Sequence, residues 1–390
     1  MQEAPKNDYA ESDKSLAPLE ERLIALDILR GVALFGVMAI NLVFEFRVSI
    51  FEQFLPVGYL ASPLDRMIAT FLDEAIELKA FALFSLLFGV GLAIQFDRLA
   101  GKSRAVLLLR RLFALLAFGI IHLALIWNGD ILTEYALAGL LVLPFLYGPR
   151  WLLAGSGLAL LAVYASSYLF RLLPFPDAGW LAHRIVEARE TYATGSFLEI
   201  LRFRVHEIAA MAPFHVWVFP RTLALFLIGA LIWRTGIVQR ASDNRWALFG
   251  AAVMAAVLTA FVSSVLATVT LAFAYAAFII GLASAPLGPM LLGWAAPLGR
   301  MAFTNYIVQS LIFGWIFYGY GLGLFGKLDV STALAIGVVV YVAQVFVSQW
   351  WLRRYRFGPI EWAWRSLMYG QLQPMRRSFA GPTSSILRKF

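Results

Sequence analysis

The sequence contains no cysteine, which excludes disulfides, thiolate catalysis and cysteine-based zinc or iron–sulfur sites. Its four histidines are not at metal-ligand spacing, so we expect no metal site. Charge is also scarce: 14% of the 390 residues are charged and 61% are apolar, whereas about a quarter of a soluble domain is charged. No soluble packing hides so much apolar surface, and the composition therefore predicts a membrane protein.

Apolar runs of about twenty residues recur along the chain, and each can cross a hydrocarbon layer about 30 Å thick as a helix. We predict an all-α fold, a polytopic transmembrane helix bundle of about ten spans. The boundary between the seventh and eighth spans is expected near Ser263-Ser264 or Thr268. The spans are expected at residues 23–46, 80–98, 106–127, 131–147, 151–172, 213–234, 245–263, 265–284, 299–319 and 330–352.

The positions of the basic residues predict the orientation of the bundle. The net charge is +8, but lysines and arginines gather at span ends and in the C-terminal tail, as the positive-inside rule describes. We therefore expect a bacterial inner-membrane protein with membrane lipids, and no nucleic acid, as partners. Both termini are expected in the cytoplasm. The expected division is a disordered cytoplasmic tail at 1–22, a bundle at 23–352 with extracytoplasmic segments 47–79 and 173–212, and a basic cytoplasmic tail at 353–390.

Polar side chains inside spans cost several kcal/mol unless they are paired or solvated, so each is a functional candidate. Asp27 and Arg30 lie three residues apart, on one helix face of the first span. They form either a local ion pair or an anion-binding group, with the arginine meeting a phosphate. Asn41 lies further along nearly the same face, and it serves either as a contact between helices or as a donor to a developing oxyanion.

The second group of candidates surrounds a predicted hairpin between the third and fourth spans. Asp130 is a predicted N-cap of the fourth span, and the hairpin brings Glu134 or Tyr135 level with His122. One interpretation is a capped hairpin with a structural histidine. The other is a general base, His122, oriented by a carboxylate in a partly buried pocket.

The ninth span carries an unusual polar stripe. Arg300 lies at its cytoplasmic edge, while Asn305, Gln309 and the offset Tyr306 follow one face. Contacts between helices through amide groups explain the stripe, and so does a hydrated cavity that binds a ligand.

Two further features have structural interpretations that we favour. Ser85 and Gly89 have the spacing of close helix packing. His215 begins the sixth span at its outer end, where it is either an alternative base or part of an aromatic belt at the membrane interface.

Several motifs resemble those of the YeiB-like bacterial inner-membrane proteins, a family of unknown function. They are Leu26-Asp27-Ile28-Leu29-Arg30-Gly31, Leu83-Phe84-Ser85-Leu86-Leu87-Phe88-Gly89, the hairpin from His122 to Ala136, Gly299-Arg300-Met301 with Thr304-Asn305-Tyr306, and Phe357-Gly358-Pro359-Ile360-Glu361-Trp362. The opening motif also resembles transmembrane acyltransferases such as heparan-α-glucosaminide N-acetyltransferase. In that group a catalytic histidine follows shortly after the asparagine that matches Asn41, whereas this chain has Glu52 there.

The second resemblance implies an acyltransferase that moves an acyl group from cytoplasmic acyl-CoA to an extracytoplasmic hydroxyl or amine, on a glycan or a lipid. His122 would be the base, oriented by Asp130 or Glu134, and Asn41 would stabilise the oxyanion. Arg30, Asp27 and Arg300 would form the site for acyl-CoA. A substrate cavity would be lined by Asn305, Gln309, Tyr135 and Tyr306. The alternatives are a transporter or channel for a small polar solute, with Asn305, Gln309, Asp27 and Arg30 along its path, and a non-catalytic scaffold; a homodimer is left open.

Overall fold

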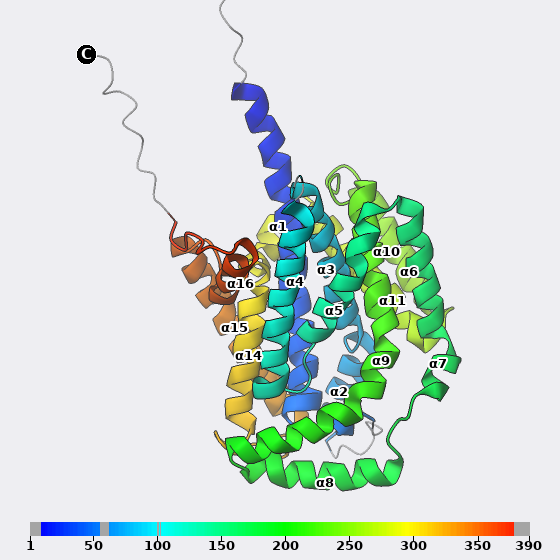
Figure 1. Cartoon of the computed structure of the whole chain (residues 1–390), viewed down its shortest axis with the longest axis vertical. Coiled ribbons are helices and arrows are strands. Elements are labelled where there is room, and N and C mark those ends of the chain that lie inside the picture. Colours follow the sequence, from blue (N-terminus) through cyan, green and yellow to red (C-terminus); the bar gives the residue numbers. More distant parts are fainter. Residues whose placement is uncertain (1–8, 55–61, 100, 102, 378–390) are drawn as a thin grey trace, which may run out of the picture.

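The computed structural model describes residues 9–54, 62–99, 101 and 103–377, without the side chains of residues 9–23, 54 and 167. Every element of the described residues is a helix, and most of these helices pack side by side in one bundle (Figure 1). The elements are α1 (Tyr9–Ile40), η1 (Asn41–Phe46), η2 (Ile50–Phe54), α2 (Pro63–Ala75), α3 (Lys79–Arg98), α4 (Ser103–Ile121), η4 (His122–Ile126), α5 (Leu132–Val142), η5 (Leu143–Tyr147), α6 (Arg150–Ala165), α7 (Ser167–Leu172), α8 (Ala178–Thr194), α9 (Phe197–Thr235), α10 (Arg245–Thr259), α11 (Ser264–Ala283), α12 (Gly288–Leu292), η6 (Gly293–Ala295), α13 (Ala296–Arg300), α14 (Ala302–Phe317), α15 (Val330–Arg354) and α16 (Pro359–Tyr369).

The predicted all-helical membrane architecture is confirmed. Six stretches of the described residues are long and apolar enough to cross a membrane: 24–46, 63–98, 103–126, 197–235, 264–283 and 330–354. The other four expected spans coincide with shorter apolar helices at 132–147, 150–165, 245–259 and 302–317. The total of ten spans stays a prediction. The turn between the seventh and eighth spans lies where it was expected, because Ser263 caps α11 through the backbone N–H of Leu266.

Glycines allow the central helices to approach closely. Gly89 on α3 faces α9 so closely that a methyl group there would overlap the carbonyl oxygen of Phe226. Gly229 on α9 is in the reciprocal position against the carbonyl oxygen of Leu86. The packing role predicted for Gly89 is therefore confirmed, and the α3–α9 contact fixes two helices that both line the site described below.

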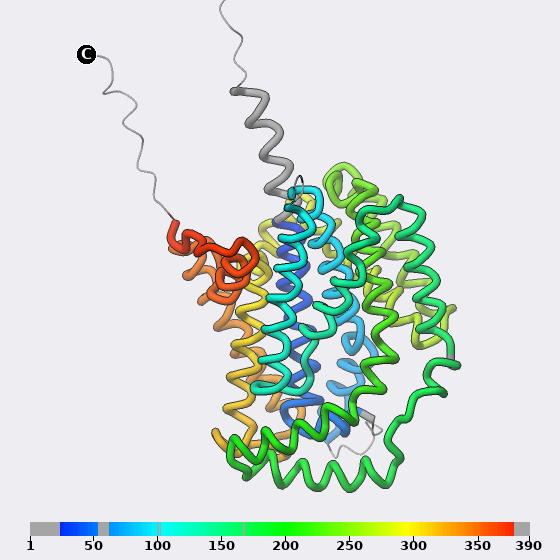
Figure 2. The backbone as a smooth tube through the Cα atoms, viewed as in Figure 1, coloured from blue at the N-terminus to red at the C-terminus, as the bar shows by residue number. Residues whose placement is uncertain are grey.

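The coloured part of α1 begins at the upper end of the bundle, and α16, in orange-red, lies in the upper half of the same view (Figure 2). At the opposite end, α8 and the first part of α9 run across the bundle (Figure 1). Both transverse stretches lie within the segment 173–212 that was expected outside the spans, and the extracytoplasmic location of this segment stays a prediction. Not all of its polar groups face solvent, however, since Arg204 and Glu207 are buried. The location of the two ends in the cytoplasm stays a prediction.

The segments expected outside the bundle contain helices of their own. In the segment expected as a basic tail, α16 folds back onto α4. There Trp364 donates a hydrogen bond to the carbonyl oxygen of Arg111 at 2.8 Å. The last part of this segment, 378–390, lies outside the described residues. The segment 47–79 contains η2 and α2, which ends before a break at Leu78 with φ of 58°. Of the tail predicted at 1–22, residues 1–8 lie outside the described residues, and α1 already begins at Tyr9.

Candidate functional site: two cavities that share a wall

A cavity of about 300 Å³ lies in the half of the bundle that carries the two chain ends. It is lined by four arginines from α1, α3, α4 and α13, and we call it the basic cavity. Its remaining wall is largely apolar and aromatic. The arginines are Arg30, Arg98, Arg111 and Arg300. A binding site with this composition suits an anionic group attached to an apolar or aromatic body.

Three buried polar atoms of residues that line the basic cavity have no hydrogen-bond partner within the described residues. They are Nε of Arg111, Oε1 of Gln95 and the hydroxyl of Tyr306. The guanidinium of Arg111 lies over the ring of Trp364 at 3.8 Å from the ring centroid. A buried polar atom without a partner costs about 1–3 kcal/mol, so this arrangement favours a ligand that supplies the missing hydrogen bonds.

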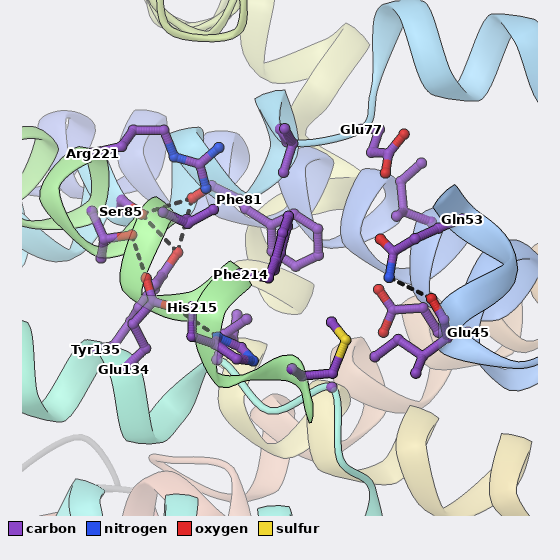
Figure 3. Close-up of a pocket in the computed structure, with 18 residues that line it drawn as sticks. Glu45, Gln53, Glu77, Phe81, Ser85, Glu134, Tyr135, Phe214, His215 and Arg221 are labelled. Carbon is purple, nitrogen blue, oxygen red and sulfur yellow. Dashed lines mark hydrogen bonds and ion pairs between the residues drawn. The ribbon is translucent and has the colours of Figure 1, made fainter. Parts of the chain in front are cut away.

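A second, smaller cavity of about 60 Å³ lies toward the end of the bundle that α8 crosses, and we call it the distal cavity. It has room for about four to six water molecules, at ~10–15 Å³ each. Figure 3 shows its polar side chains in two groups, with Phe81 and Phe214 between them. One group contains Ser85, Glu134, Tyr135, His215 and Arg221, and the other contains Glu45, Gln53 and Glu77.

A histidine–carboxylate pair forms part of the distal cavity. Nδ1 of His215 on α9 lies 3.3 Å from Oε2 of Glu134 on α5. The other oxygen of Glu134 accepts a hydrogen bond from the hydroxyl of Thr222, about two turns further along α9. The side chain of His215 is 36% exposed, and none of the described residues hydrogen-bonds its Nε2. The carboxylate thus holds one ring nitrogen and leaves the other available to a molecule in the cavity.

Arg221 supplies a positive charge to the same cavity. The residue is only 2% exposed, and its Nε and Nη1 have no hydrogen-bond partner among the described side chains and backbone groups. Together with His215 it gives the distal cavity one proton acceptor and one cationic donor. This pairing of groups is suited to deprotonating a nucleophile and stabilising an oxyanion.

The two cavities share part of their wall. Ile131 and Tyr135 line both of them. The hydroxyl of Tyr135 donates to the carbonyl oxygen of Phe81 at 2.8 Å and accepts from Ser85 at 3.0 Å. A reactive group that reached Tyr135 from the basic cavity would therefore meet the boundary of the distal cavity.

The residues predicted at the hairpin are divided between two places. His122 lies against Asp130, with Nδ1 2.9 Å from Oδ1. It is fully buried, however, and lines neither the basic nor the distal cavity. Glu134 does not orient His122, because the hairpin turns it toward His215 on α9. The N-cap of α5 is Ile131, one residue after the predicted position, but the carboxylate of Asp130 accepts from the backbone N–H of Thr133 at 2.7 Å in the first turn.

The polar stripe on α14 faces another helix instead of a cavity. Asn305 donates to Oγ of Ser348 at 3.0 Å, and Gln309 donates to Oε1 of Gln344 at 2.8 Å. Both partners belong to α15, and neither Asn305 nor Gln309 lines the basic or the distal cavity. These are the amide contacts between helices that the sequence allowed, and a cavity role for the two residues stays a prediction. Tyr306, offset from this stripe, does line the basic cavity.

The first span agrees with its prediction in part. Arg30 pairs with Asp27, Nη1 to Oδ1 at 2.7 Å, and Arg30 also lines the basic cavity, as Arg300 does. Asn41 is buried at the start of the π-helical turn η1 and lines neither of the two cavities. Its role as an oxyanion donor stays a prediction. No group of three or more potential metal ligands occurs among the described residues.

Several site residues escaped the sequence analysis. Arg98 and Arg111 were not singled out there, and neither were Trp364, Arg221 and Glu45. Arg111 carried one usable signal, because it lies well inside an apolar helix where an arginine needs a buried partner or a ligand.

The fold and the site together define a class: a helical membrane protein whose basic cavity meets a smaller cavity with a histidine–carboxylate pair inside the bundle. Residues 210–371 match the family described as "Protein of unknown function (DUF418)". The chain is 32% identical to the uncharacterized protein YxaH of Bacillus subtilis, and 31% identical to the uncharacterized protein YeiB of Escherichia coli. These alignments cover 92% and 89% of this chain and 96% of each relative.

A third relative, an uncharacterized 39.9 kDa protein of Bacillus acidopullulyticus, is 30% identical over 92% of this chain and 96% of its own length. The chain therefore belongs to the YeiB-like DUF418 family of proteins of unknown function. No solved structure matches it.

Proposed function

We propose that the protein is an acyltransferase of the bacterial cytoplasmic membrane that moves an acyl group from acyl-CoA to a hydroxyl or amine on the other side. The observation that carries this proposal is the wall shared by the two cavities at Ile131 and Tyr135. Arginines lie on one side of this wall and the His215–Glu134 pair lies on the other. Donor and acceptor can thus approach one point from opposite ends of the bundle.

The basic cavity suits the donor. In the proposed orientation the basic cavity faces the cytoplasm. The phosphate groups of acyl-CoA would pair with its arginines, Arg30, Arg98, Arg111 and Arg300. The acyl end of the donor would lie toward Tyr135, among apolar side chains. The unpartnered Nε of Arg111 supports this assignment, because a phosphate oxygen would accept its hydrogen bond.

The distal cavity suits the nucleophilic group of the acceptor. Its volume of about 60 Å³ gives room for this group but not for the rest of the acceptor molecule. His215 takes the proton of the acceptor hydroxyl or amine at Nε2, while Glu134 stabilises the resulting imidazolium. The acceptor then attacks the thioester carbonyl, whose oxyanion lies near Arg221. The carbon–sulfur bond breaks, the thiolate leaves, and the proton held by His215 balances it. One good oxyanion donor contributes about 3 kcal/mol to such a step.

A transfer assay with matched histidine variants tests this function. The purified protein in nanodiscs would be incubated with radiolabelled acyl-CoA and a bacterial membrane extract. Loss of a general base lowers the rate by about 10²–10⁴-fold, which is the result expected for His215→Gln. The control is His183→Gln, since His183 forms a similar pair with Glu187 at 3.3 Å on the exposed surface of α8. Absence of transfer by the wild type, or wild-type transfer by His215→Gln, would overturn the proposal.

A transporter for a small polar solute is the second candidate, and the same shared wall favours it, because two cavities separated by a few side chains resemble the two halves of a path. A transporter needs no base. Solute uptake into proteoliposomes that persists at the wild-type rate in His215→Gln would support transport over acyl transfer.

A further inference from the structure

His122 belongs to a second constellation, separate from both cavities. It begins η4, the π-helical turn that ends the helix of α4, and π-helical turns occur frequently at functional sites. Its Nδ1 lies 2.9 Å from Oδ1 of Asp130, and its Nε2 lies 3.0 Å from Oγ of Ser310 on α14. Three separate elements thus bring a carboxylate, an imidazole and a hydroxyl into one line of hydrogen bonds.

The contacts of Asp130 fix the direction of these hydrogen bonds. The backbone N–H groups of Leu132 and Thr133 donate to its two oxygens at 3.1 and 2.7 Å. A carboxylate held in this way accepts the Nδ1–H of His122. In the neutral imidazole, Nε2 is then an acceptor, so that only the hydroxyl of Ser310 can donate in their contact.

The order of the groups is that of a nucleophile, its base and the carboxylate that orients the base. Such a triad is recognised by its geometry and not by the order of its residues in the chain. The hydroxyl of Ser310 has one alternative acceptor, the carbonyl oxygen of Tyr306 at 3.2 Å. The geometry of His122 and Ser310 is therefore that of a serine whose proton can be taken by a histidine.

Ser310 also lines a groove of about 460 Å³ on the outside of the bundle. Leu125, Leu311 and Trp315 line the same groove and are exposed, at 47%, 52% and 59%. Leu125 belongs to the candidate span 103–126, most of whose side chains lie outside the protein interior. In a membrane these exposed apolar side chains meet lipid tails, and the occupant of the groove is accordingly the acyl chain of a membrane lipid.

We propose that Ser310 is a nucleophile that accepts an acyl group from an ester-linked membrane lipid in this groove. Oγ of Ser310 attacks the ester carbonyl, and its proton passes to Nε2 of His122. The bond between the carbonyl carbon and the lipid alcohol breaks, and the alcohol leaves with that proton. Ser310 then carries the acyl ester, which water or an acceptor alcohol removes by the reverse sequence. Asp130 is a positioning residue, and the inference uses none of the residues proposed for the two cavities.

Covalent labelling tests the inference on the intact protein. A fluorophosphonate with an alkyl tail would be added to the protein in nanodiscs, and the adduct would be located by peptide mass spectrometry. We expect an adduct on Ser310 in the wild type, none there in Ser310→Ala, and labelling at least about a hundredfold slower in His122→Gln. The matched control is Ser348→Ala, since Ser348 is a fully buried serine that accepts a hydrogen bond from Asn305. This variant should be labelled as fast as the wild type.

Two more measurements separate catalysis from a structural role. In Asp130→Asn the maximal labelling rate should fall while the probe concentration that gives half of this rate stays unchanged, because the amide no longer holds the Nδ1–H tautomer of His122. In nanodiscs of ester-linked phosphatidylglycerol, Ser310 should gain the mass of one acyl chain, and in those of ether-linked phosphatidylglycerol it should not. Folded wild-type protein without an adduct on Ser310, equal labelling of His122→Gln, or equal acylation with both lipids would overturn the inference.

Discussion

Replacement of Arg111 by glutamine gives the most direct test of the basic cavity. The Nε of Arg111 is buried at the cavity wall and has no partner among the described residues. A phosphate group of coenzyme A would give it a hydrogen bond between charged groups, which contributes about 1.5–3 kcal/mol. This free energy corresponds to a factor of about 10 to 150 in Kd. We therefore expect Arg111→Gln to weaken coenzyme A binding by that factor.

The assay is isothermal titration calorimetry with coenzyme A, on protein in nanodiscs at one fixed salt concentration. Arg354→Gln is the control, because Arg354 is an exposed arginine of α15 that does not line the basic cavity. Thermal unfolding without ligand shows whether loss of the contact with Trp364 has damaged the fold. A change in Kd below about threefold in folded Arg111→Gln, or an equal change in Arg354→Gln, would refute the reasoning.

Two further predictions, one about a helix contact and one about a buried carboxyl group, can be tested by thermal unfolding in detergent. The methyl group of Gly89→Ala would overlap the carbonyl oxygen of Phe226, so this variant should be destabilised by about 1–3 kcal/mol or more. The control Gly250→Ala meets no atom within 4 Å and should be neutral or stabilising. Equal unfolding temperatures of the two variants would contradict the packing. Burial raises the pKa of Glu361 from its ordinary value of 4.5, against the opposing hydrogen bonds from Thr304. The folded state therefore binds the proton of Glu361 more tightly than the unfolded state does. The stability of the wild type relative to Glu361→Gln should decline as the pH rises through 4.5, and it should level off above the raised pKa. A stability difference in favour of the wild type that grows with pH would contradict this prediction.

Local sequence patterns predicted what depends on neighbours in the chain. Apolar runs predicted the helices, and the contact of Asp130 with the first turn of α5 followed from a polar residue before a helix start. The ion pair of Asp27 with Arg30 followed from helical spacing, and so did the tight helix contact at Gly89. Each of these depends on residues within a turn or two, or on the size of a single side chain.

Contacts between distant helices could not be predicted in this way. Glu134 was expected beside His122 because the hairpin brings both close, but its partner is His215, on a helix much further along the chain. For Asn305 a cavity and a neighbouring helix were both open, because a polar stripe does not show which neighbour it faces. The partner helix, α15, is a largely apolar span, and the sequence gives no sign that Gln344 and Ser348 are the partners. Arrangements of this kind follow from the packing of the whole bundle.

The walls of the basic cavity come from nearly the whole length of the chain, from Arg30 on α1 to Trp364 on α16. Helices of a membrane protein leave the ribosome in order, so this cavity cannot close until the last of them has been made. A nascent chain that stops after α15 lacks the wall formed by Glu361 and Trp364. If the basic cavity binds an anionic ligand, as proposed above, that binding depends on α16 being in place.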